Sequence, residues 1–332
     1  MQIAVVGATG AVGREMCSIL EQRRFPAECV TLLASGRSAG KRVRYAGADL
    51  TVAELTTTSL NSVDFALFSA GSGISRAFAK PAATAGTVVI DNSSAFRMDP
   101  DVPLVIPEIN PQDAETHTGI IANPNCSTII LAVAVWPLHR VNPVRRIVVS
   151  TYQAASGAGA AAMQELHDQT RDVLDQKPAV PKVLPHQSAF NVFSHDSPID
   201  DSGFNEEERK MVHETHKIFH DGGIRITATC VRVPVLRAHA ESVNLTFERP
   251  FTEQEVRELL DQAPGLKVVD DRGRNYFPMP IDASGQDDVL VGRIRQDPGD
   301  PSGCSIAMFT CGDQLRKGAA LNAIQILGLL SQ

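Results

Sequence analysis

The sequence lacks the features that would place a chain in a membrane, on an export pathway or on nucleic acid. No apolar stretch approaches about 18 uninterrupted residues, so we expect no membrane-spanning helix. The N-terminus has no basic segment and reaches Gly7 after four apolar residues, which argues against a secretory signal. The net charge is −7 at pH 7, which argues against nucleic acid and anionic membranes as main partners.

The cysteines form neither a CxxC pair nor a dense cluster. This spacing excludes a disulfide framework and indicates the reduced thiols of a cytoplasmic protein. We expect no metal site, and we find no internal repeat or low-complexity segment. The six cysteines are Cys17, Cys29, Cys126, Cys230, Cys304 and Cys311.

What the sequence does have is typical of a globular protein. Its 332 residues suit one large or two moderate domains. Hydrophobic residues make up 43% and charged residues 21%, which provides enough apolar material for a core.

The first half alternates short apolar runs with helical stretches. We predict strands at residues 3–6, 30–34, 65–69 and 87–91, and helices at residues 10–24 and 74–85. This alternation predicts an α/β, Rossmann-type parallel sheet covered on both faces. Such sheets bind ligands at the carboxyl ends of their strands.

The second half, after Trp136-Pro137, has more strands and fewer crossovers. We predict strands at 146–151, 224–233, 241–247, 289–295 and 305–310, and helices at 160–170, 206–219 and 315–330. A capping box at Thr252 predicts one further helix. Residues 176–202 contain four prolines and form an irregular segment that is mobile or covers a site. Together these elements predict an α+β domain with a mixed or antiparallel sheet.

Three glycines follow the first predicted strand and open the first helix. Gly7, Gly10 and Gly13 have the spacing G-x-x-G-x-x-G. Glycines there let the backbone approach a pyrophosphate, and the helix N-terminus supplies N–H donors. The segment therefore predicts a dinucleotide site, with a plain strand-to-helix turn as the alternative.

The second strand ends at Ala34 and is followed by Ser35, Arg37 and Ser38, with no carboxylate among them. An acidic residue near this point binds the ribose 2′-hydroxyl of NAD, whereas an arginine accommodates a 2′-phosphate. We therefore predict NADP; a solvated loop arginine is the alternative. Ser69 and Gly71 end a later strand and form a second small-residue edge.

Cys126 lies in the sequence Asn-Pro-Asn-Cys-Ser-Thr, directly before the apolar run 129–136. Pro124 favours an extended residue before it, so the sulfur is expected at or near a helix N-terminus. Free N–H groups and the helix dipole favour a thiolate there. Cys126 is thus a candidate nucleophile for carbonyl chemistry, and a packed, inert cysteine is the alternative.

Two further segments carry polar groups after predicted strands. Residues 151–159 are rich in small side chains and suit close ligand approach. Residues 232–239 contain Arg232, Arg237 and His239. His239 is a candidate acid/base beside a cysteine; a surface or packed histidine is the alternative.

Seven segments, in order along essentially the whole chain, resemble the aspartate-β-semialdehyde dehydrogenase family. The resemblance is nearest to the branch found in Gram-positive bacteria and some proteobacteria. The segments are residues 7–13, 92–97, 123–128, 153–159, 214–218, 232–239 and 312–326.

The resemblance implies NADP-dependent, phosphate-dependent interconversion of L-aspartate 4-semialdehyde and L-4-aspartyl phosphate through a cysteine thioester. This reaction serves lysine (diaminopimelate), threonine and methionine biosynthesis. It also implies a cytoplasmic homodimer or dimer of dimers. The implied domains are an NADP-binding domain at 1–126, completed by a C-terminal helix at 313–332, and a catalytic and dimerisation domain at 127–312.

Site roles follow from the same resemblance, and Arg237 receives none. Catalysis is assigned to the nucleophile Cys126, the acid/base His239 and the acyl-orienting Gln153. Substrate and phosphate contacts are assigned to Arg97, Asn125, Gln153, Glu214, Lys217 and Arg232. In these contacts Arg232 holds the carboxylate, Glu214 meets the ammonium group, and Arg97 and Lys217 bind phosphate. Cofactor contacts are assigned to Gly7, Thr9, Gly10, Ala11, Val12, Gly13, Ser35, Arg37, Ser38, Ser69, Gly71, Asn92, Ser156, Gly157 and Asn322.

Two other interpretations compete with this one. N-acetyl-γ-glutamyl-phosphate reductase uses similar cysteine chemistry on a longer, acylated substrate. A non-catalytic dimeric homologue on the same scaffold is the alternative from another class. A glyceraldehyde-phosphate-type dehydrogenase fits less well, because its cysteine lies in a different local sequence.

Overall fold

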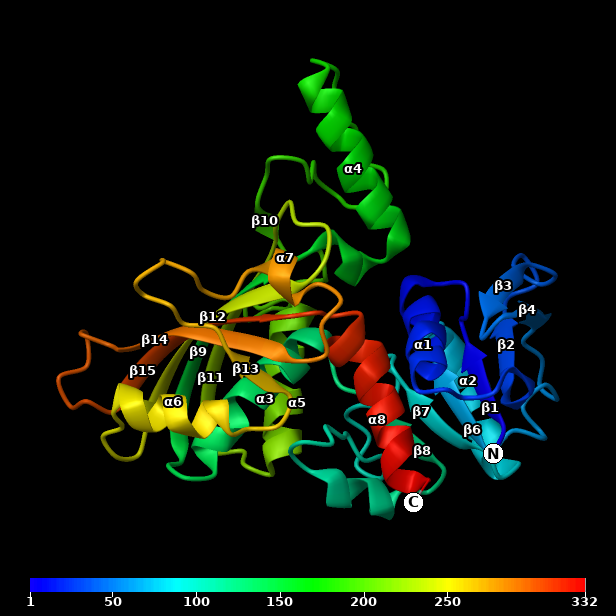
Figure 1. The fold of residues 1–332 in the computed structure, drawn as a ribbon, viewed down its shortest axis with the longest axis horizontal. Helices are drawn as coiled ribbons and strands as arrows, with labels where there is room; N and C mark the ends of the chain where they lie inside the picture. The colour runs from blue at the N-terminus through cyan, green and yellow to red at the C-terminus, as the bar shows by residue number, and fades with distance from the viewer. Residues whose placement is uncertain (332) are drawn as a thin grey trace. The chain divides into compact units, whose positions relative to one another are not determined.

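The structure, a computed structural model, describes residues 1–331, which form two compact units. Unit 1 comprises Met1–Asn125 and the C-terminal segment that begins at Ala319, and unit 2 comprises Cys126–Gly318. Each unit is built around its own β-sheet (Figure 1). Within residues 1–331 no helix is long and apolar enough to cross a membrane.

Unit 1 contains a six-stranded sheet in the order β5-β2-β1-β6-β7-β8. Every pairing is parallel, which confirms the Rossmann-type prediction. All four residues of β1 are buried, as expected for a parallel strand covered on both faces. The strands are β1 (Ile3–Val6), β2 (Val30–Ala34), β5 (Ala53–Glu54), β6 (Phe65–Phe68), β7 (Val88–Asp91) and β8 (Ile120–Ala122).

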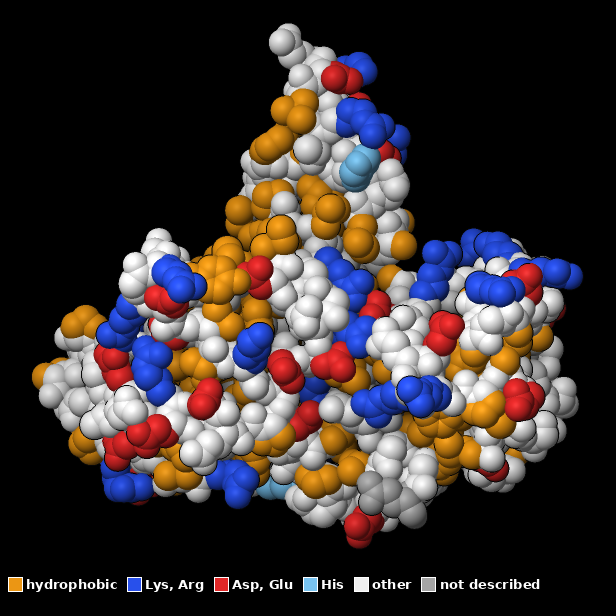
Figure 2. Space-filling view, in the orientation of Figure 1, with side chains coloured by type: hydrophobic (Ala, Val, Ile, Leu, Met, Phe, Trp, Pro, Cys, Tyr) orange, Lys and Arg blue, Asp and Glu red, His pale blue; other side chains and the backbone are white. Residues whose placement is uncertain are grey.

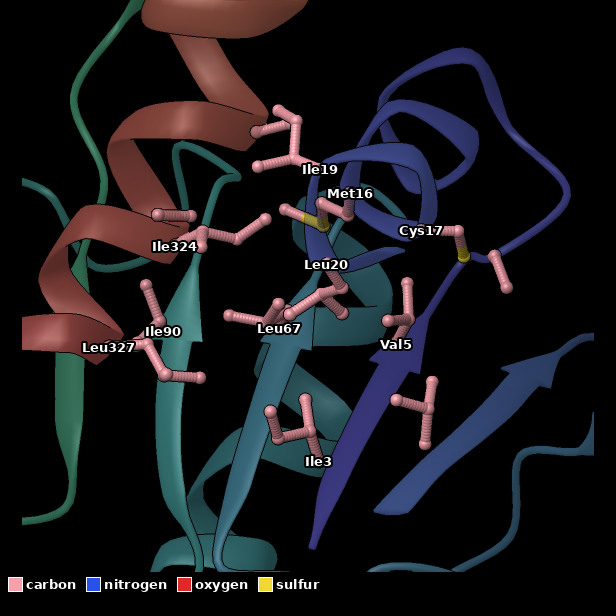
Figure 3. Packing of buried hydrophobic residues seen from close by; sticks show 14 of the residues in the cluster. Ile3, Val5, Met16, Cys17, Ile19, Leu20, Leu67, Ile90, Ile324 and Leu327 are labelled. Carbon is pink, nitrogen blue, oxygen red and sulfur yellow. The ribbon is translucent and has the colours of Figure 1, made fainter. Parts of the chain in front are cut away.

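Three helices, α1 (Ala11–Gln22), α2 (Ser72–Thr84) and α8 (Leu321–Leu330), pack on this sheet. Figure 3 shows side chains of α1 and α8 in one apolar cluster with side chains of the strands. Ile324 and Leu327 of α8 belong to this cluster, together with Ile90 of β7. Each such side chain contributes about 1.5–3 kcal/mol when fully buried. The last helix of the chain is therefore part of the core of unit 1.

A small hairpin in unit 1 was not predicted from the sequence. β3 (Arg42–Tyr45) and β4 (Ala48–Thr51) pair in an antiparallel manner across a two-residue turn. Both turn residues, Ala46 and Gly47, have positive φ. The hairpin is attached to the unit by the buried Tyr45, whose hydroxyl donates to the Phe25 carbonyl at 2.8 Å.

Unit 2 contains a seven-stranded sheet in the order β10-β11-β9-β12-β15-β14-β13. The β11–β9 and β13–β14 pairs are parallel and the other pairs are antiparallel, so the predicted mixed sheet is confirmed. The strands are β9 (Val144–Gln153), β10 (Phe193–Ser194), β11 (Arg225–Arg232), β12 (His239–Phe247), β13 (Leu266–Val268), β14 (Val289–Gln296) and β15 (Ser305–Gly312).

Three helices, α3 (Cys126–His139), α5 (Glu206–Phe219) and α6 (Glu253–Asp261), lie against this sheet. α3 is apolar on all sides and touches α5, α6 and four strands, β9, β12, β14 and β15, as expected for a buried helix. The capping box predicted at Thr252 is present: its hydroxyl accepts from the Glu255 amide, and the Glu255 carboxylate accepts from the Thr252 amide.

The segment after α4 (Ala160–Leu174) is held to that helix by hydrogen bonds. The Glu165 carboxylate accepts from the amides of Lys182, Val183 and Leu184. The Gln169 side chain accepts from the amides of Ser188 and Ala189. Several apolar side chains of this region remain exposed, and Figure 2 shows hydrophobic side chains gathered over it. The short helix α7 (Pro280–Ala283) completes the unit.

Glu241 is a buried carboxyl group near the middle of unit 2. It lies on β12 opposite Thr310 of β15, with none of its side chain exposed. Among residues 1–331 neither carboxyl oxygen has a hydrogen-bond partner. Burial raises the pKa of Glu241 well above its ordinary value of 4.5, so the folded chain keeps this group protonated at pH values at which the unfolded chain has released the proton.

Replacing Glu241 by glutamine is expected to increase the free energy of unfolding at pH 8 and to change it little at pH 5. The folded chain keeps a proton that the unfolded chain releases above pH 4.5. The free energy of unfolding of the wild type therefore falls by up to about 1.4 kcal/mol per pH unit as the pH rises. Glutamine cannot ionise and removes this loss. Denaturant titrations of the wild type and the variant at both pH values measure the difference in their free energies of unfolding. Equal differences at pH 5 and pH 8 would contradict the assignment.

Candidate active site

The glycine turn after β1 forms a tight cradle at the N-terminus of α1. Gly7 has φ +87°, and a Cβ there would lie 2.9 Å from Ser69. A Cβ on Gly13 would lie 2.2 Å from the Gly7 carbonyl oxygen. Only glycine fits these two positions. No side chain caps α1, so its first N–H groups face the turn, as a bound phosphate requires.

The turn after β2 lies next to this cradle. The Thr9 hydroxyl donates to the Ser38 hydroxyl at 3.4 Å, which joins the two turns. Arg37 is exposed. The structure also brings a carboxylate here that the sequence analysis did not find: Glu54 of β5 lies 2.8 Å from the position of a Cβ on Gly36. Glu54 could be found only from the β2–β5 pairing, since it is 17 residues beyond Arg37 in the sequence.

The remaining predicted cofactor residues of unit 1 that follow its strands lie after β6 and β7. Ser69 donates to the Val6 carbonyl at 3.0 Å, and Gly71, with φ +87°, precedes α2. Asn92 follows β7, and its side-chain oxygen accepts from Asn123 at 2.7 Å. These residues therefore lie at the carboxyl ends of neighbouring parallel strands, the edge where such sheets bind ligands.

Arg97 and Asn322 are both built into the interior of unit 1. Arg97 donates to the carbonyl oxygens of Asn123, at 2.9 Å, and Asn92, at 2.8 Å. The Asn322 amide donates to the Asn123 side chain at 2.7 Å and to the Val105 carbonyl at 3.0 Å. Both hydrogens of the Asn322 amide are thus used within unit 1. The predicted cofactor contact of Asn322 would have to use its oxygen.

Cys126 is the first residue of α3, as the sequence predicted, and it is partly exposed. Gly318 packs on it: a Cβ there would lie 3.0 Å from the Cys126 Cβ. The buried cysteines differ, because burial raises the pKa of the Cys17 thiol to about 11 and raises the pKa values of Cys230 and Cys311 further. Those three thiols are inert at neutral pH.

His239 begins β12 and is completely buried. Its Nδ1 accepts from the Ala154 amide at 3.0 Å, so the hydrogen of the neutral ring lies on Nε2. Among the described residues Nε2 has no partner. Burial, and then the charge of Arg232, lower the pKa of His239 to about 3. The ring is therefore neutral at physiological pH and offers an N–H donor.

Arg232 ends β11 and directs one nitrogen to the same point. Its Nε donates to the Asp196 carboxylate at 2.9 Å, whereas its buried Nη1 has no partner within residues 1–331. A Cβ on Gly157 would lie 3.0 Å from His239 Nε2 and 3.2 Å from Arg232 Nη1. Two buried, unpartnered donors thus converge above Gly157. An oxygen-rich anionic ligand there would satisfy both.

Gln153 completes this group at the end of β9. It is paired with Arg232 in the β9–β11 register. Its side-chain oxygen accepts from the Thr151 hydroxyl at 3.1 Å, and its nitrogen donates to the Glu207 carboxylate at 3.1 Å. The carboxyl ends of β9 and β11 and the start of β12 therefore meet at one site.

Glu207 and Lys210 lie beside Gln153 and were not selected by the sequence analysis. Lys210 lies 3.5 Å from the Glu207 carboxylate. The pair has the same E-x-x-K spacing as Glu214 and Lys217, which the resemblance had selected, but it lies one heptad earlier on α5. Seven residues span about 10 Å of helix, so Glu207 and Glu214 cannot both contact one small substrate at Gln153.

Asp196 and Ser197 were also missed. Asp196 is partly buried, but the Arg232 charge and hydrogen bond outweigh that burial and hold the pKa of this carboxyl below its ordinary value. The Ser197 hydroxyl accepts from the Glu207 amide at 3.1 Å. The segment predicted to be mobile or to cover a site thus holds both Arg232 and the start of α5. Only the β10–β11 pairing reveals this.

Two family models match the chain. Residues 2–117 match the model described as semialdehyde dehydrogenase, NAD binding domain. Residues 135–317 match the model described as semialdehyde dehydrogenase, dimerisation domain.

Individual relatives agree with these matches. An aspartate-semialdehyde dehydrogenase from Synechocystis is 54% identical over 330 residues, 99% of this chain and 97% of the relative. The Bacillus subtilis enzyme of that name is 45% identical over 98% of this chain and 96% of its own. The crystal structure of aspartate semialdehyde dehydrogenase II from Vibrio cholerae superimposes with a TM-score of 0.95 at 44% identity, covering 99% of this chain and 98% of that one. A second structure of the Vibrio protein, equally similar, is a complex with ASA. The chain therefore belongs to the semialdehyde dehydrogenase family and, within it, to the aspartate-semialdehyde dehydrogenases.

Proposed function

We propose that the chain interconverts L-aspartate 4-semialdehyde and L-4-aspartyl phosphate, using NADP and inorganic phosphate. The observation that carries this proposal is the convergence of His239 Nε2 and Arg232 Nη1 above Gly157, both buried and without partners among the described residues. Family membership gives the same reaction. The ASA complex of the Vibrio enzyme further supports this substrate.

NADP fits the residues of unit 1. The cradle at Gly7 and Gly13 and the uncapped start of α1 suit a pyrophosphate. Arg37 suits a 2′-phosphate. Glu54, beside Gly36, supplies a negative charge at the same edge, and the preference for NADP therefore depends on Arg37 outweighing it. When bound, NADP supplies the hydride acceptor of the dehydrogenating direction.

Arg232 and Glu207 would hold the amino-acid end of the substrate. Arg232 offers a planar fork for the α-carboxylate, and Asp196 fixes that fork through Nε. Glu207 is buried beside Gln153 and suits the α-ammonium group. An N-acetylated substrate carries no ammonium charge and could not make this charge-assisted contact with the Glu207 carboxylate. This favours the aspartyl substrate over the acylated alternative.

Cys126 would attack the aldehyde carbon as a thiolate, which the start of α3 favours. The attack forms a C–S bond and an oxyanion. His239 would stabilise that oxygen by donating from Nε2, because Nδ1 is engaged by the Ala154 amide. Loss of hydride from the carbon then leaves a thioester on Cys126. We therefore propose a donor role for His239 in place of the proton-accepting role expected from the resemblance.

Phosphate would complete the reaction by attacking the thioester carbon, which releases aspartyl phosphate and the Cys126 thiolate. Arg97, Lys217 and Lys210 are the candidate phosphate-binding cations. Lys210 is one turn from Glu207 and so belongs to the group around Gln153. Asn125 directly precedes Cys126 and remains our candidate for a second contact to the oxyanion.

The organisation of the protein follows from these roles. We propose that unit 1, including α8, is the NADP-binding domain and that unit 2 is the catalytic and dimerisation domain. The dimerisation-domain model covers most of unit 2 and supports a homodimer or a dimer of dimers. A cytoplasmic location is consistent with the six free cysteines.

The experiment that tests this function follows NADPH formation from L-aspartate 4-semialdehyde with and without phosphate. We expect phosphate-dependent turnover with NADP. Absence of turnover with this substrate, together with turnover of N-acetylglutamate semialdehyde, would favour the acylated-substrate enzyme. No turnover of either would favour a non-catalytic homologue.

In the same assay Glu207→Gln is expected to raise KM for the semialdehyde about 10- to 100-fold, because a hydrogen-bonded charge partner of the ammonium group is lost. Glu214→Gln is the matched control, since it makes the same change one heptad later on α5. We expect Glu214→Gln to leave this KM within about threefold. The reverse result, with the large rise at Glu214, would restore the assignment made from the sequence.

A further inference from the structure

The residue directly before His239 has a strained backbone. Ala238 is completely buried and has φ +72°, a left-handed conformation that alanine rarely adopts. Such strain persists only where the surrounding contacts impose it, and it gathers at functional sites. The contacts of Ala238 and its neighbour Arg237, which has no assigned role, therefore bear on how His239 is held.

Two side chains of the turn after β15 bind these residues. The Ala238 amide donates to the Gln314 side-chain oxygen at 2.9 Å. Arg237 Nε donates to the Asp313 carboxylate at 2.7 Å. Asp313 is completely buried and also accepts from the amides of Gly285 and Leu315. We call Arg237, Ala238, Asp313 and Gln314 the 237/313 clamp.

The 237/313 clamp reaches both sides of the site. Gln314 is almost fully buried, and its nitrogen donates to the Ser156 hydroxyl, next to Gly157. In the β12–β15 register His239 lies opposite Gly312, directly before the clamp. The side-chain amide of Gln314 thus joins Ala238, which directly precedes His239, to Ser156, which directly precedes Gly157. This connection joins the two segments that border the gap between His239 Nε2 and Gly157, where the substrate oxygen is proposed to bind.

We propose that Arg237 and Gln314 are positioning residues that fix the imidazole of His239 by imposing the left-handed conformation of Ala238. The inference deepens the proposed function and rests on the role given there to His239. If the clamp is lost, residue 238 relaxes and the His239 ring moves from its position above Gly157. A displacement of about 1 Å at a reacting group can lower the rate about 100-fold.

The test compares Arg237→Gln and Gln314→Leu with Arg257→Gln. Arg257 is a matched control, because it pairs with the buried Asp270 at 2.6 Å and is 24% exposed, against 28% for Arg237. We expect both clamp variants to lower kcat about 10-fold or more, with KM for the semialdehyde nearly unchanged. Arg257→Gln is expected to lower thermal stability and to leave kcat unchanged. Equal losses of kcat in Arg237→Gln and Arg257→Gln would overturn the proposal.

A second substitution tests the strain directly. Glycine adopts φ +72° without cost, so adding Ala238→Gly to Gln314→Leu is expected to restore most of the lost kcat. Failure of this rescue would overturn the proposal. If Gln314→Leu changed only KM for NADP, the proposal would also be overturned, and Gln314 would be a cofactor contact.

A readout that does not need turnover separates this inference from the proposed function. In an NMR titration, the His239 ring of the wild type is expected to stay neutral down to about pH 3. In Gln314→Leu it is expected to titrate at a higher pH, because the loosened ring meets solvent. An inactive wild type would reject the proposed function, yet a shift in this titration would still support the clamp. An unshifted titration in an active enzyme would reject the clamp alone.

Discussion

Replacing Gly157 by alanine is expected to lower kcat/KM for the semialdehyde about 100-fold or more. The added methyl group would lie 3.0 Å from the His239 ring and 3.2 Å from Arg232 Nη1. It would occupy the point at which the two donors converge, so the substrate could not place its aldehyde oxygen at His239 and its carboxylate at Arg232. Residue 157 lies outside the left-handed region, and alanine therefore causes no backbone strain there. The loss should appear in activity while the fold is retained.

The control for this prediction is Gly222→Ala. Gly222 is also in unit 2 and outside the left-handed region, and a Cβ there meets nothing within 4 Å. We expect the control to keep wild-type kcat/KM and melting temperature. If Gly157→Ala kept kcat/KM within about threefold of the wild type, the site would have to lie elsewhere, since overfilling a packed site costs at least about 1 kcal/mol.

The parallel sheet of unit 1 could be predicted from the sequence because its signals are local. β2 coincides with the predicted residues 30–34, and β1 with residues 3–6. Each is a short apolar run next to a turn or a helix, and a parallel strand buried on both faces has that sequence. The capping box at Thr252 was predictable for the same reason, since its two hydrogen bonds connect residues three apart.

The missed hairpin shows where local signals fail. A two-residue hairpin turn needs positive φ at its central positions, and sequence analysis looks there for Asn-Gly, Asp-Gly or Gly-Gly. Ala46 occupies the first position with φ 47°. Alanine gives no turn signal, so tertiary contacts such as the Tyr45 hydrogen bond must hold this conformation.

The proposed catalytic group could be predicted only in part, because strand pairing assembles it. Cys126 and His239 were proposed from their own segments. The contact of Gln153 with Glu207 joins residues 54 apart, and the choice between Glu207 and Glu214 depends on where α5 begins relative to the end of β9. The two E-x-x-K pairs look alike in sequence. Only the folded structure shows which of the two pairs lies beside Gln153.

Replacing Cys126 by serine is expected to lower kcat about 10,000-fold or more. The start of α3 favours a thiolate, whereas a serine hydroxyl at the same place stays protonated and is a weak nucleophile. An ester is also a poorer hydride acceptor than a thioester, so both chemical steps are slowed. The serine side chain is smaller, so it does not clash with Gly318, and we expect the melting temperature to be nearly unchanged.

The measurement combines phosphate-dependent NADPH formation with alkylation of the folded protein by iodoacetamide. Cys304→Ser is the matched control, because Cys304 is also partly exposed but lies before β15, outside the group around Gln153. In the wild type we expect Cys126 to be alkylated first at neutral pH, with activity lost in step. The buried thiols of Cys17, Cys230 and Cys311 should remain unmodified, because burial raises their pKa values. If Cys126→Ser kept turnover, or if alkylation at Cys126 left activity intact, then no thioester forms on this residue and the acyl group must be carried elsewhere.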